Sequence, residues 1–259
     1  MGVVNVTPDS FSDGGMYLSP DAAVAHGEEL VRDGAEILDV GGESTRPGAE
    51  PVEAEGELAR TRPVVEGLAG KATVSIDTSK APVAEAALDA GAEIVNDVTA
   101  LRGDPEMAGL CADRGAGVVL MHMLGTPRTM QEDPRYEDVV DDVKAFLAAR
   151  LQFAAGEGVD EKRVWLDPGI GFGKRLEHNL ELIRRLGELR QLGRPLVLGT
   201  SRKSFIGKVD GSSVSDRLGG TVASSVLGAA NGADVLRVHD VAEIGQAMRM
   251  ADALLPAGG

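Results

Sequence analysis

Carboxylate and amide side chains recur in this sequence directly after short apolar runs, and cationic side chains recur in the same kind of position. The clearest members of the first group are Asp77, Asn96 and Asp167. The second group comprises Arg46, Lys203, Arg237 and His239. Carboxylate and amide oxygens accept hydrogen bonds from the N–H edge of a flat heterocycle, and a guanidinium forks onto carboxylate or phosphate oxygens. Together the two groups predict a ligand with a heterocyclic part and an anionic part.

Each of these positions also has a purely structural interpretation. An aspartate at the end of a strand often caps the next helix, which leaves both interpretations open for Asp77 and Asp97. Asp167 favours a ligand, because a Pro-Gly pair follows it and no helix is expected close behind. For Arg237 and His239 the alternative is a salt bridge on the rim of the site.

The segments that would position these side chains alternate along the chain as strand, loop and helix. Eight short apolar runs are predicted strands, at residues 2–6, 36–40, 72–76, 93–95, 117–120, 164–166, 195–198 and 235–236. Predicted helices separate them, at residues 20–32, 51–68, 80–90, 107–114, 136–155, 179–189, 215–230 and 241–255. Eight such units without a linker predict an α/β protein, a single (β/α)8 TIM barrel that residues 1–259 form as one domain.

In such a barrel the C-terminal ends of all strands face one mouth, where ligands bind. The loop after the first strand, residues 7–15, follows Asn5 and is dense in turn formers. Pro8 cannot continue a strand ladder, and the Asp, Ser and Gly residues around it offer carboxylates, hydroxyls and bare backbone amides. His122, after the fifth strand, is interpreted as a structural residue that lines the barrel.

Composition argues against several other functions. The formal net charge of −15 repels polyanions, which disfavours a general nucleic-acid or anionic-membrane role. Hydrophobic residues make up 43% and aromatic residues only 3%, as expected for parallel strands buried on both faces. Cys111 is the only cysteine, so the chain has no internal disulfide and a reducing compartment is favoured. With no signal peptide and no apolar run long enough to span a bilayer, a cytoplasmic location is predicted.

Five sequence runs are recognisable together. They are NVTPDSFSDGG from Asn5, DVGGESTRPG from Asp39, DPGIGFGK from Asp167, SRKS from Ser201 and RVHD from Arg237. In this order they resemble the dihydropteroate synthase family, the folate-pathway enzymes that sulfonamide drugs inhibit. The resemblance implies a transferase that condenses 6-hydroxymethyl-7,8-dihydropterin diphosphate with 4-aminobenzoate, giving 7,8-dihydropteroate and diphosphate with Mg²⁺ present. It also implies a homodimer.

The same resemblance implies roles for individual residues. Asn5 would ligate Mg²⁺ on the diphosphate, which Arg237 and His239 would also hold. The pterin slot would be lined by Asp77, Asn96, Met121, Asp167 and Lys203. The 4-aminobenzoate site would be formed by Phe11, Thr45, Arg46, Pro47, Phe172 and Ser204, with Phe11 and Asp13 on a mobile loop. The residues expected to take part in catalysis are Asp13, Arg46, Lys203, Arg237 and His239.

The residue types agree with this chemistry. An arylamine is neutral at pH 7, so no strong general base is needed, and the sequence contains no obvious pair of nucleophile and base. The harder task is departure of diphosphate, which leaves positive charge at the exocyclic methylene of the pterin. Carboxylates at Asp77 and Asp167 would favour that charge.

Two alternatives remain open. A pterin-dependent methyltransferase barrel would share the pterin slot but has no use for a diphosphate site. A pterin-binding paralogue without synthase activity would be expected to have degraded its first or second loop, and both loops look intact. One departure from the family is visible, because the chain begins on the first strand without the usual short leader. We therefore expect either a less well plugged barrel bottom or a truncated start.

Overall fold

The computed structural model describes residues 1–7, 19–45 and 48–254. Its strands alternate with helices in the predicted order, and all eight predicted strands are present. They are β1 (Gly2–Asn5), β2 (Ile37–Gly41), β3 (Thr73–Asp77), β4 (Ile94–Asp97), β5 (Gly117–Met121), β6 (Val164–Asp167), β7 (Val197–Leu198) and β8 (Val235–Leu236). Paired strands are parallel, so their C-terminal ends point the same way.

Backbone pairing closes these strands into a ring. Strands β1 to β6 form one sheet in chain order, and β7 pairs with β8. A parallel bridge between Leu166 and Leu196 joins β6 to the residue that leads into β7. A second parallel bridge, between Gly2 and Val238, joins β1 to the residues just after β8, and Val3 N donates to Val238 O over 3.1 Å. The prediction of an eight-stranded TIM barrel is therefore confirmed.

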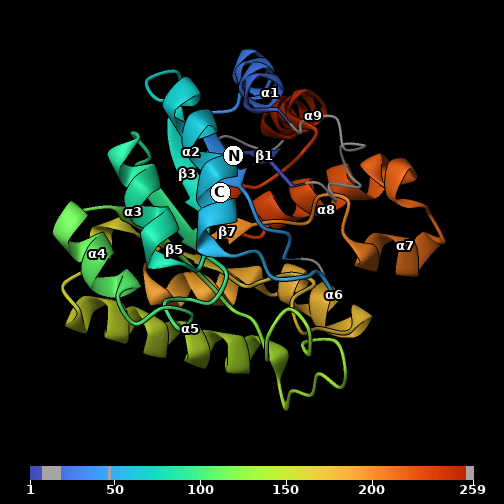
Figure 1. Ribbon diagram of the computed structural model, residues 1–259. Coiled ribbons are helices and arrows are strands. Elements are labelled where there is room, and N and C mark those ends of the chain that lie inside the picture. The colour runs from blue at the N-terminus through green and yellow to red at the C-terminus, as the bar shows by residue number, and fades with distance from the viewer. Residues whose placement is uncertain (8–18, 46–47, 255–259) are drawn as a thin grey trace.

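The helices form an outer layer around the strands (Figure 1). They are α1 (Pro20–Arg32), α2 (Ala54–Leu68), α3 (Ala81–Asp89), α4 (Met107–Arg114), α5 (Val139–Gly156), α6 (Leu176–Arg184), α7 (Ser204–Asp210), α8 (Leu218–Ala230) and α9 (Val241–Leu254). Helix α9 lies beside α1, since a Cβ added at Gly245 would be 3.9 Å from Asp33 O. The last helix thus completes the layer next to the first one.

The observed helices differ from the predicted ones most between residues 176 and 230. The helices predicted at residues 51–68 and 136–155 each begin three residues later, as α2 and α5. The helix predicted at residues 179–189 begins earlier, as α6, and continues as a 3₁₀ segment, Leu186–Leu192. The helix predicted at residues 215–230 is divided into a 3₁₀ turn, Val214–Asp216, and α8. Helix α7 was not predicted at all. It contains Gly207, where an added Cβ would be 2.7 Å from Arg217 Nη2. This short helix depends on tertiary contact, because an isolated helix of its length is unstable in water.

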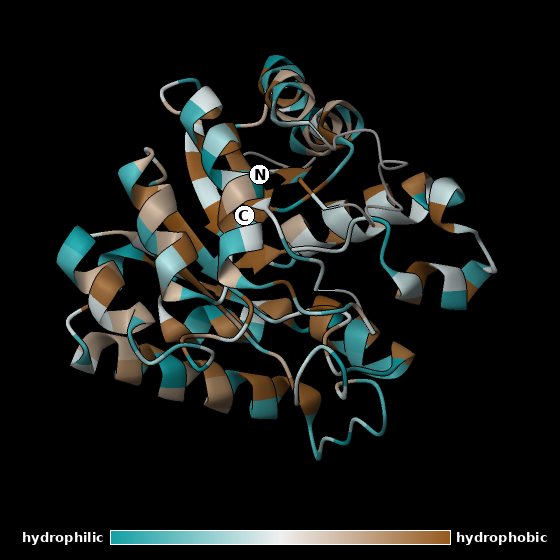
Figure 2. Ribbon diagram, viewed as in Figure 1, coloured by the Kyte–Doolittle hydropathy of each residue, from teal (hydrophilic) through white to brown (hydrophobic). Residues whose placement is uncertain are grey.

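Apolar side chains pack on both faces of the strands. Outward-facing residues such as Leu38 and Val40 join the main core beneath the helices. A separate apolar cluster, which we call the lower layer, lies inside the barrel and comprises Ile37, Ile94, Val119, Trp165, Val197 and Val235. Figure 2 shows largely apolar strands at the centre and helices in which apolar and polar residues alternate. Because side chains alternate along a strand, the next inward position lies two residues nearer the mouth.

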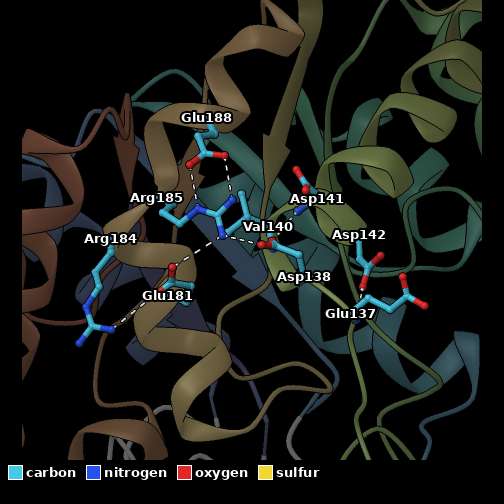
Figure 3. A network of polar contacts seen from close by, with 9 residues as sticks. All are labelled: Glu137, Asp138, Val140, Asp141, Asp142, Glu181, Arg184, Arg185 and Glu188. Atoms are coloured by element: carbon cyan, nitrogen blue, oxygen red, sulfur yellow. Dashed lines mark hydrogen bonds and ion pairs between the residues drawn. The ribbon is translucent and has the colours of Figure 1, made fainter.

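Ion pairs link the helices on the outside of the molecule (Figure 3). Arg185, just after α6, donates from Nη1 to Asp138 Oδ2 over 2.7 Å and from Nε to Glu188 Oε1 over 2.8 Å. The Asp138 carboxylate also caps α5 by accepting from Val140 N and Asp141 N. One guanidinium therefore connects the end of α6 with the first turn of α5.

Candidate active site

Strand register places four positions in one row at the mouth of the barrel. Asn5 on β1 pairs with Gly41 on β2, Gly41 pairs with Asp77 on β3, and Asp77 pairs with Asn96 on β4. Gly41 has no side chain, and a Cβ added there would lie 3.7 Å from Asn5 Oδ1 and 3.8 Å from Asp77 Oδ2. The side chains of Asn5 and Asp77 therefore flank an open position.

Asp39 lies at the centre of the polar cluster, although it was not among the predicted site residues. Its carboxylate is fully buried and accepts from Ser75 Oγ (2.6 Å), Asn96 Nδ2 (3.0 Å) and Arg237 Nε (2.6 Å). Inspection of strand ends missed it, because it lies two residues before the end of β2. An aspartate inside an apolar strand was the available signal, since a carboxylate is rarely buried without a partner.

Arg237 joins two carboxylates inside the barrel. Its Nε donates to Asp39, and its Nη2 donates to Asp77 Oδ2 over 2.9 Å. Burial opposes the charge of the guanidinium, but the attraction of Asp39 and Asp77 outweighs it and raises the pKa of Arg237. Burial raises the pKa of Asp77 to about 7, against the attraction of Arg237 and with repulsion from Asp39. The salt-bridge alternative for Arg237 is thus realised, but within the mouth rather than on its rim.

The two aspartates with open interpretations behave differently. The Asp97 carboxylate accepts from Thr99 N (2.7 Å), Thr99 Oγ1 (2.7 Å) and Leu101 N (2.8 Å), so it stabilises the turn after β4. Asp77 instead pairs with Arg237, and helix α3 has Lys80 as its N-cap residue. Neither aspartate therefore caps the next helix: Asp97 stabilises the turn after β4, and Asp77 pairs with Arg237 beside the open position at Gly41.

Met121, Asp167 and Lys203 form the opposite side of the mouth. Met121 on β5 pairs in register with Asp167 on β6. Asp167 Oδ1 accepts from Gly169 N over 2.6 Å, and burial raises the pKa of this carboxyl group while Lys203 opposes the shift. Burial lowers the pKa of Lys203 to about 8, partly offset by the attraction of Asp167. Lys203 donates to the carbonyl of Ile170.

Gly199, just after β7, connects the two sides of the site. A Cβ added at Gly199 would lie 3.6 Å from Lys203 Nζ and 3.8 Å from Arg237 Cβ. His239 follows Arg237 and contacts the same loop, because its N donates to Ser201 Oγ over 3.2 Å and its Nδ1 lies 3.0 Å from that oxygen. Three predicted cationic residues, Lys203, Arg237 and His239, are thus brought to the same mouth, with Gly199 between Lys203 and Arg237.

An apolar wall borders these polar groups. It is formed by Val98, Met121, Met123, Met130 and Phe172. The Phe172 ring lies 4.8 Å from Lys203 Nζ, a cation–π distance. Ser204 is exposed at the start of α7, next to Lys203. Thr45 is half-buried at the end of a described segment. The remaining predicted residues, Phe11, Asp13, Arg46 and Pro47, lie outside the described residues.

The polar mouth can be tested for a metal site. Within residues 1–7, 19–45 and 48–254, no group of three or more His, Cys, Asp or Glu side chains could hold a metal ion. Asn5 offers one amide oxygen beside the open position at Gly41. Mg²⁺ commonly takes few protein ligands and completes its shell with water and substrate phosphate oxygens. The donor set around Asn5 therefore fits a Mg²⁺ ion that arrives with a diphosphate.

Comparison with known proteins gives a consistent assignment. A family model described as pterin binding enzyme matches residues 1–239. The chain belongs to this family. Similar proteins include the Escherichia coli dihydropteroate synthase, which is 46% identical over 259 residues, covering 99% of this chain and 92% of that protein. The resemblance found in the sequence motifs is therefore confirmed.

Two solved structures resemble this one over nearly its whole length. The Yersinia pestis dihydropteroate synthase in complex with a sulfonamide drug has a TM-score of 0.95 at 42% identity, covering 98% of this chain and 93% of that chain. The Xanthomonas albilineans dihydropteroate synthase in complex with 7,8-dihydropteroate has a TM-score of 0.89 at 43% identity, with coverages of 100% and 94%. The barrel described above is thus the fold of that family.

Proposed function

We propose that this chain is a transferase that condenses 6-hydroxymethyl-7,8-dihydropterin diphosphate with 4-aminobenzoate, giving 7,8-dihydropteroate and diphosphate. The observation that carries the proposal is the cluster at the mouth. There Arg237 is held between Asp39 and Asp77, while Lys203 and Asp167 lie across from them. The relatives support it, since the Escherichia coli dihydropteroate synthase is 46% identical over nearly the full chain and one solved neighbour holds 7,8-dihydropteroate.

The pterin would occupy the slot between the two sides of the mouth. Asp77, Asn96, Asp167 and Lys203 supply the polar groups of this slot, and Met121 supplies an apolar surface. A pterin edge has adjacent N–H donors and ring acceptors. The carboxylates match the donors and the half-buried Lys203 ammonium matches an acceptor, so each partner satisfies the other's hydrogen bonds.

The reaction then requires a leaving group and a nucleophile to be placed, rather than a strong base. The C–O bond to diphosphate breaks with its electron pair on the diphosphate, and the arylamine nitrogen forms the new C–N bond. The surplus proton on that nitrogen passes to solvent. Arg237 and His239 stabilise charge on the departing diphosphate, and the carboxylates of Asp77 and Asp167 stabilise positive charge at the pterin methylene.

The aminobenzoate would bind beside the apolar wall. Phe172 borders the mouth on this side, 4.8 Å from Lys203 Nζ, and Ser204 follows Lys203 at the start of α7. The family resemblance adds Phe11, Thr45, Arg46 and Pro47, with Asp13 on the first loop. Arg46 is expected to pair with the carboxylate of aminobenzoate, because a guanidinium forks onto two carboxylate oxygens.

Mg²⁺ would be held by Asn5 together with diphosphate oxygens. When bound, the ion neutralises charge on the leaving diphosphate. Asn5→Ala, or removal of Mg²⁺ by chelation, should weaken binding of the pterin diphosphate much more than binding of the free pterin. Calorimetric titration with both ligands measures this difference. Equal losses for the two ligands would rule out the metal role of Asn5.

The assembly proposed is a homodimer in the cytoplasm. Large apolar side chains are exposed on the late helices, including Val209 on α7 at 63% and Leu227 on α8 at 59%. Such residues are common where a second copy packs. Light scattering should give a dimer for the wild type and a monomer for Leu227→Glu.

Cys111 is buried and unpaired, which fits a reducing compartment. None of the helices in the described residues is long and apolar enough to cross a membrane.

The decisive test incubates purified protein with the pterin diphosphate and 4-aminobenzoate, with and without Mg²⁺. Formation of 7,8-dihydropteroate and diphosphate in equal amounts supports the proposed function. Pterin binding without product would instead identify a paralogue without synthase activity. Methyl transfer from a methylated pterin would identify the methyltransferase alternative.

A further inference from the structure

The loop between β6 and α6 is held by an unusual set of hydrogen bonds. Each of the four consecutive carbonyls of residues 170–173 accepts from a different side chain. The donors, in carbonyl order, are Lys203, Gln131, Lys174 and Tyr136. These donors come from the start of α7, the loop before α5, and the loop itself. Backbone carbonyls in a loop usually face water, so this arrangement fixes the path of the loop on several sides.

Lys174 is the most buried of these donors. Its side chain is 1% exposed, and its Nζ lies 2.8 Å from His122 Nδ1 and 3.0 Å from Phe172 O. No carboxylate is within hydrogen-bond distance of the Nζ among the contacts in the described residues. Burial lowers the pKa of Lys174 well below its usual value, and burial likewise lowers the pKa of His122 to about 2. Burying a lysine amine costs solvation free energy, so the hydrogen bonds that Lys174 makes must compensate for that cost.

His122 gives Lys174 a rigid partner. The imidazole packs edge-on against Phe146 of α5 at 4.8 Å between ring centroids, and Gly169 crosses directly over its backbone. A Cβ added at Gly169 would lie 1.9 Å from His122 O, and Gly169 has a φ of +67°. The loop thus packs closely against the end of β5, and Lys174 links His122 to the carbonyl of Phe172.

Phe172 is the residue whose position this arrangement decides. Its ring packs on the apolar wall and lies 4.8 Å from Lys203 Nζ, while its carbonyl accepts from Lys174. We propose that Lys174, braced by His122, is a positioning residue that holds Phe172 where 4-aminobenzoate packs. The proposal rests on the proposed synthase function and adds a residue that touches neither substrate.

The principal variant is Lys174→Met, which keeps the length of the side chain and removes the amine. Loss of the hydrogen bond to Phe172 O is expected to raise the KM for 4-aminobenzoate about tenfold, while the KM for the pterin diphosphate changes less than about threefold. The matched control is Lys162→Met, which replaces an exposed lysine in the 3₁₀ turn that precedes β6. It should change neither constant. Equal rises in both KM values, or none, would overturn the proposal.

A double-mutant cycle tests whether Lys174 acts through Phe172. If it does, adding Lys174→Met to Phe172→Ala should raise the KM for 4-aminobenzoate no further than Phe172→Ala alone. Additive effects would show that Lys174 acts elsewhere. Tyr136→Phe offers a second variant. It removes only the Tyr136 hydroxyl, which donates to Gly173 O. It should shift the same KM in the same direction by a smaller factor, even if Lys174→Met folds poorly.

Hydrogen exchange separates this inference from the proposed function. Amides in residues 169–173 should exchange about tenfold faster in Lys174→Met than in wild type or Lys162→Met, with no substrate present. Unchanged exchange would overturn the positioning role whatever the wild type catalyses. Absence of product from the wild type would overturn the synthase function, and with it the role toward aminobenzoate, while the exchange data would still decide whether Lys174 holds the loop.

Discussion

The two ends of the barrel interior differ sharply although the same strands build both. In the lower layer the inward residues are apolar, including Ile37, Ile94, Trp165 and Val235. Two positions further along the same strands, the inward residues are Asp39, Asn96, Asp167 and Arg237. Because inward positions recur every second residue, moving from one inward position to the next along each strand changes the interior from a packed core to a polar site.

This difference separates the source of stability from the source of function. The lower layer stabilises the barrel by keeping apolar surface from water. The upper layer holds buried charges that offset one another, with Arg237 between Asp39 and Asp77, and Lys203 near Asp167. Buried charges are costly unless paired, so such a layer is retained for what it binds rather than for the stability it adds.

The largest effect is expected from Arg237→Met. The substitution leaves Asp39 and Asp77 buried without their cation, which costs about 3–5 kcal/mol when one partner of a buried pair is removed. We expect turnover to fall at least about a hundredfold and urea unfolding to shift to lower concentration. Arg62→Met is the control, because its pair with Glu66 is exposed and such pairs contribute only about 0–1 kcal/mol. Similar results for both variants would break the contrast between buried and exposed pairs.

Ile94→Ala tests the lower layer. Removing most of a buried isoleucine side chain is expected to reduce the free energy of unfolding by about 2–5 kcal/mol. At a temperature where the variant stays folded, both KM values should remain those of the wild type. Denaturant titration and initial rates on the same preparation make the comparison. A large rise in either KM would mean that the two layers are not independent.

Asp167→Asn tests the upper layer at its pterin side. The substitution keeps the shape but removes the charge and puts an NH₂ group where a ligand donor would meet it. A charge-assisted hydrogen bond contributes about 1.5–3 kcal/mol, so kcat/KM should fall roughly ten- to a hundredfold. Stability without ligand should change little. Asp97→Asn is the matched control, since Asp97 stabilises a turn and should affect unfolding but not the calorimetric dissociation constant for a pterin.

The smallest effect is the pH dependence that Asp77 confers on stability. Burial raises the pKa of this carboxyl group to about 7 in the folded protein, from a usual value of 3.8. Between these values the folded state keeps a proton that the unfolded state has lost, so stability falls as pH rises toward 7. The free energy of unfolding of Asp77→Asn should therefore rise relative to that of the wild type by at most about 1.4 kcal/mol per pH unit up to pH 7. Above pH 7 the difference should level off. Urea unfolding at pH 5, 6, 7 and 8 measures this gain, and the difference between wild type and Ile94→Val should stay constant.

The sequence alone determined the order of the strands and of every helix in the described residues except α7, and most of the polar residues at the mouth. Short runs of Val, Ile and Leu predicted each strand, because local composition and length suffice to distinguish them from helices. Asp77, Asn96, Asp167, Lys203 and Arg237 were found because parallel strands end at a common edge. This rule needs no knowledge of side-chain contacts.

Tertiary structure decided which polar residues pair and which elements depend on distant contacts. Asp39 acquires its role only when Arg237, 198 positions away along the chain, closes against it. Asp77 and Asp97 are each the last residue of a strand, yet one faces Arg237 and the other stabilises a turn. Helix α7 and the buried pair of Lys174 and His122 likewise depend on neighbours from other segments. Local propensity and periodicity carry no information about such partners, because the free energy of these groups depends on burial and on charges supplied by the rest of the fold.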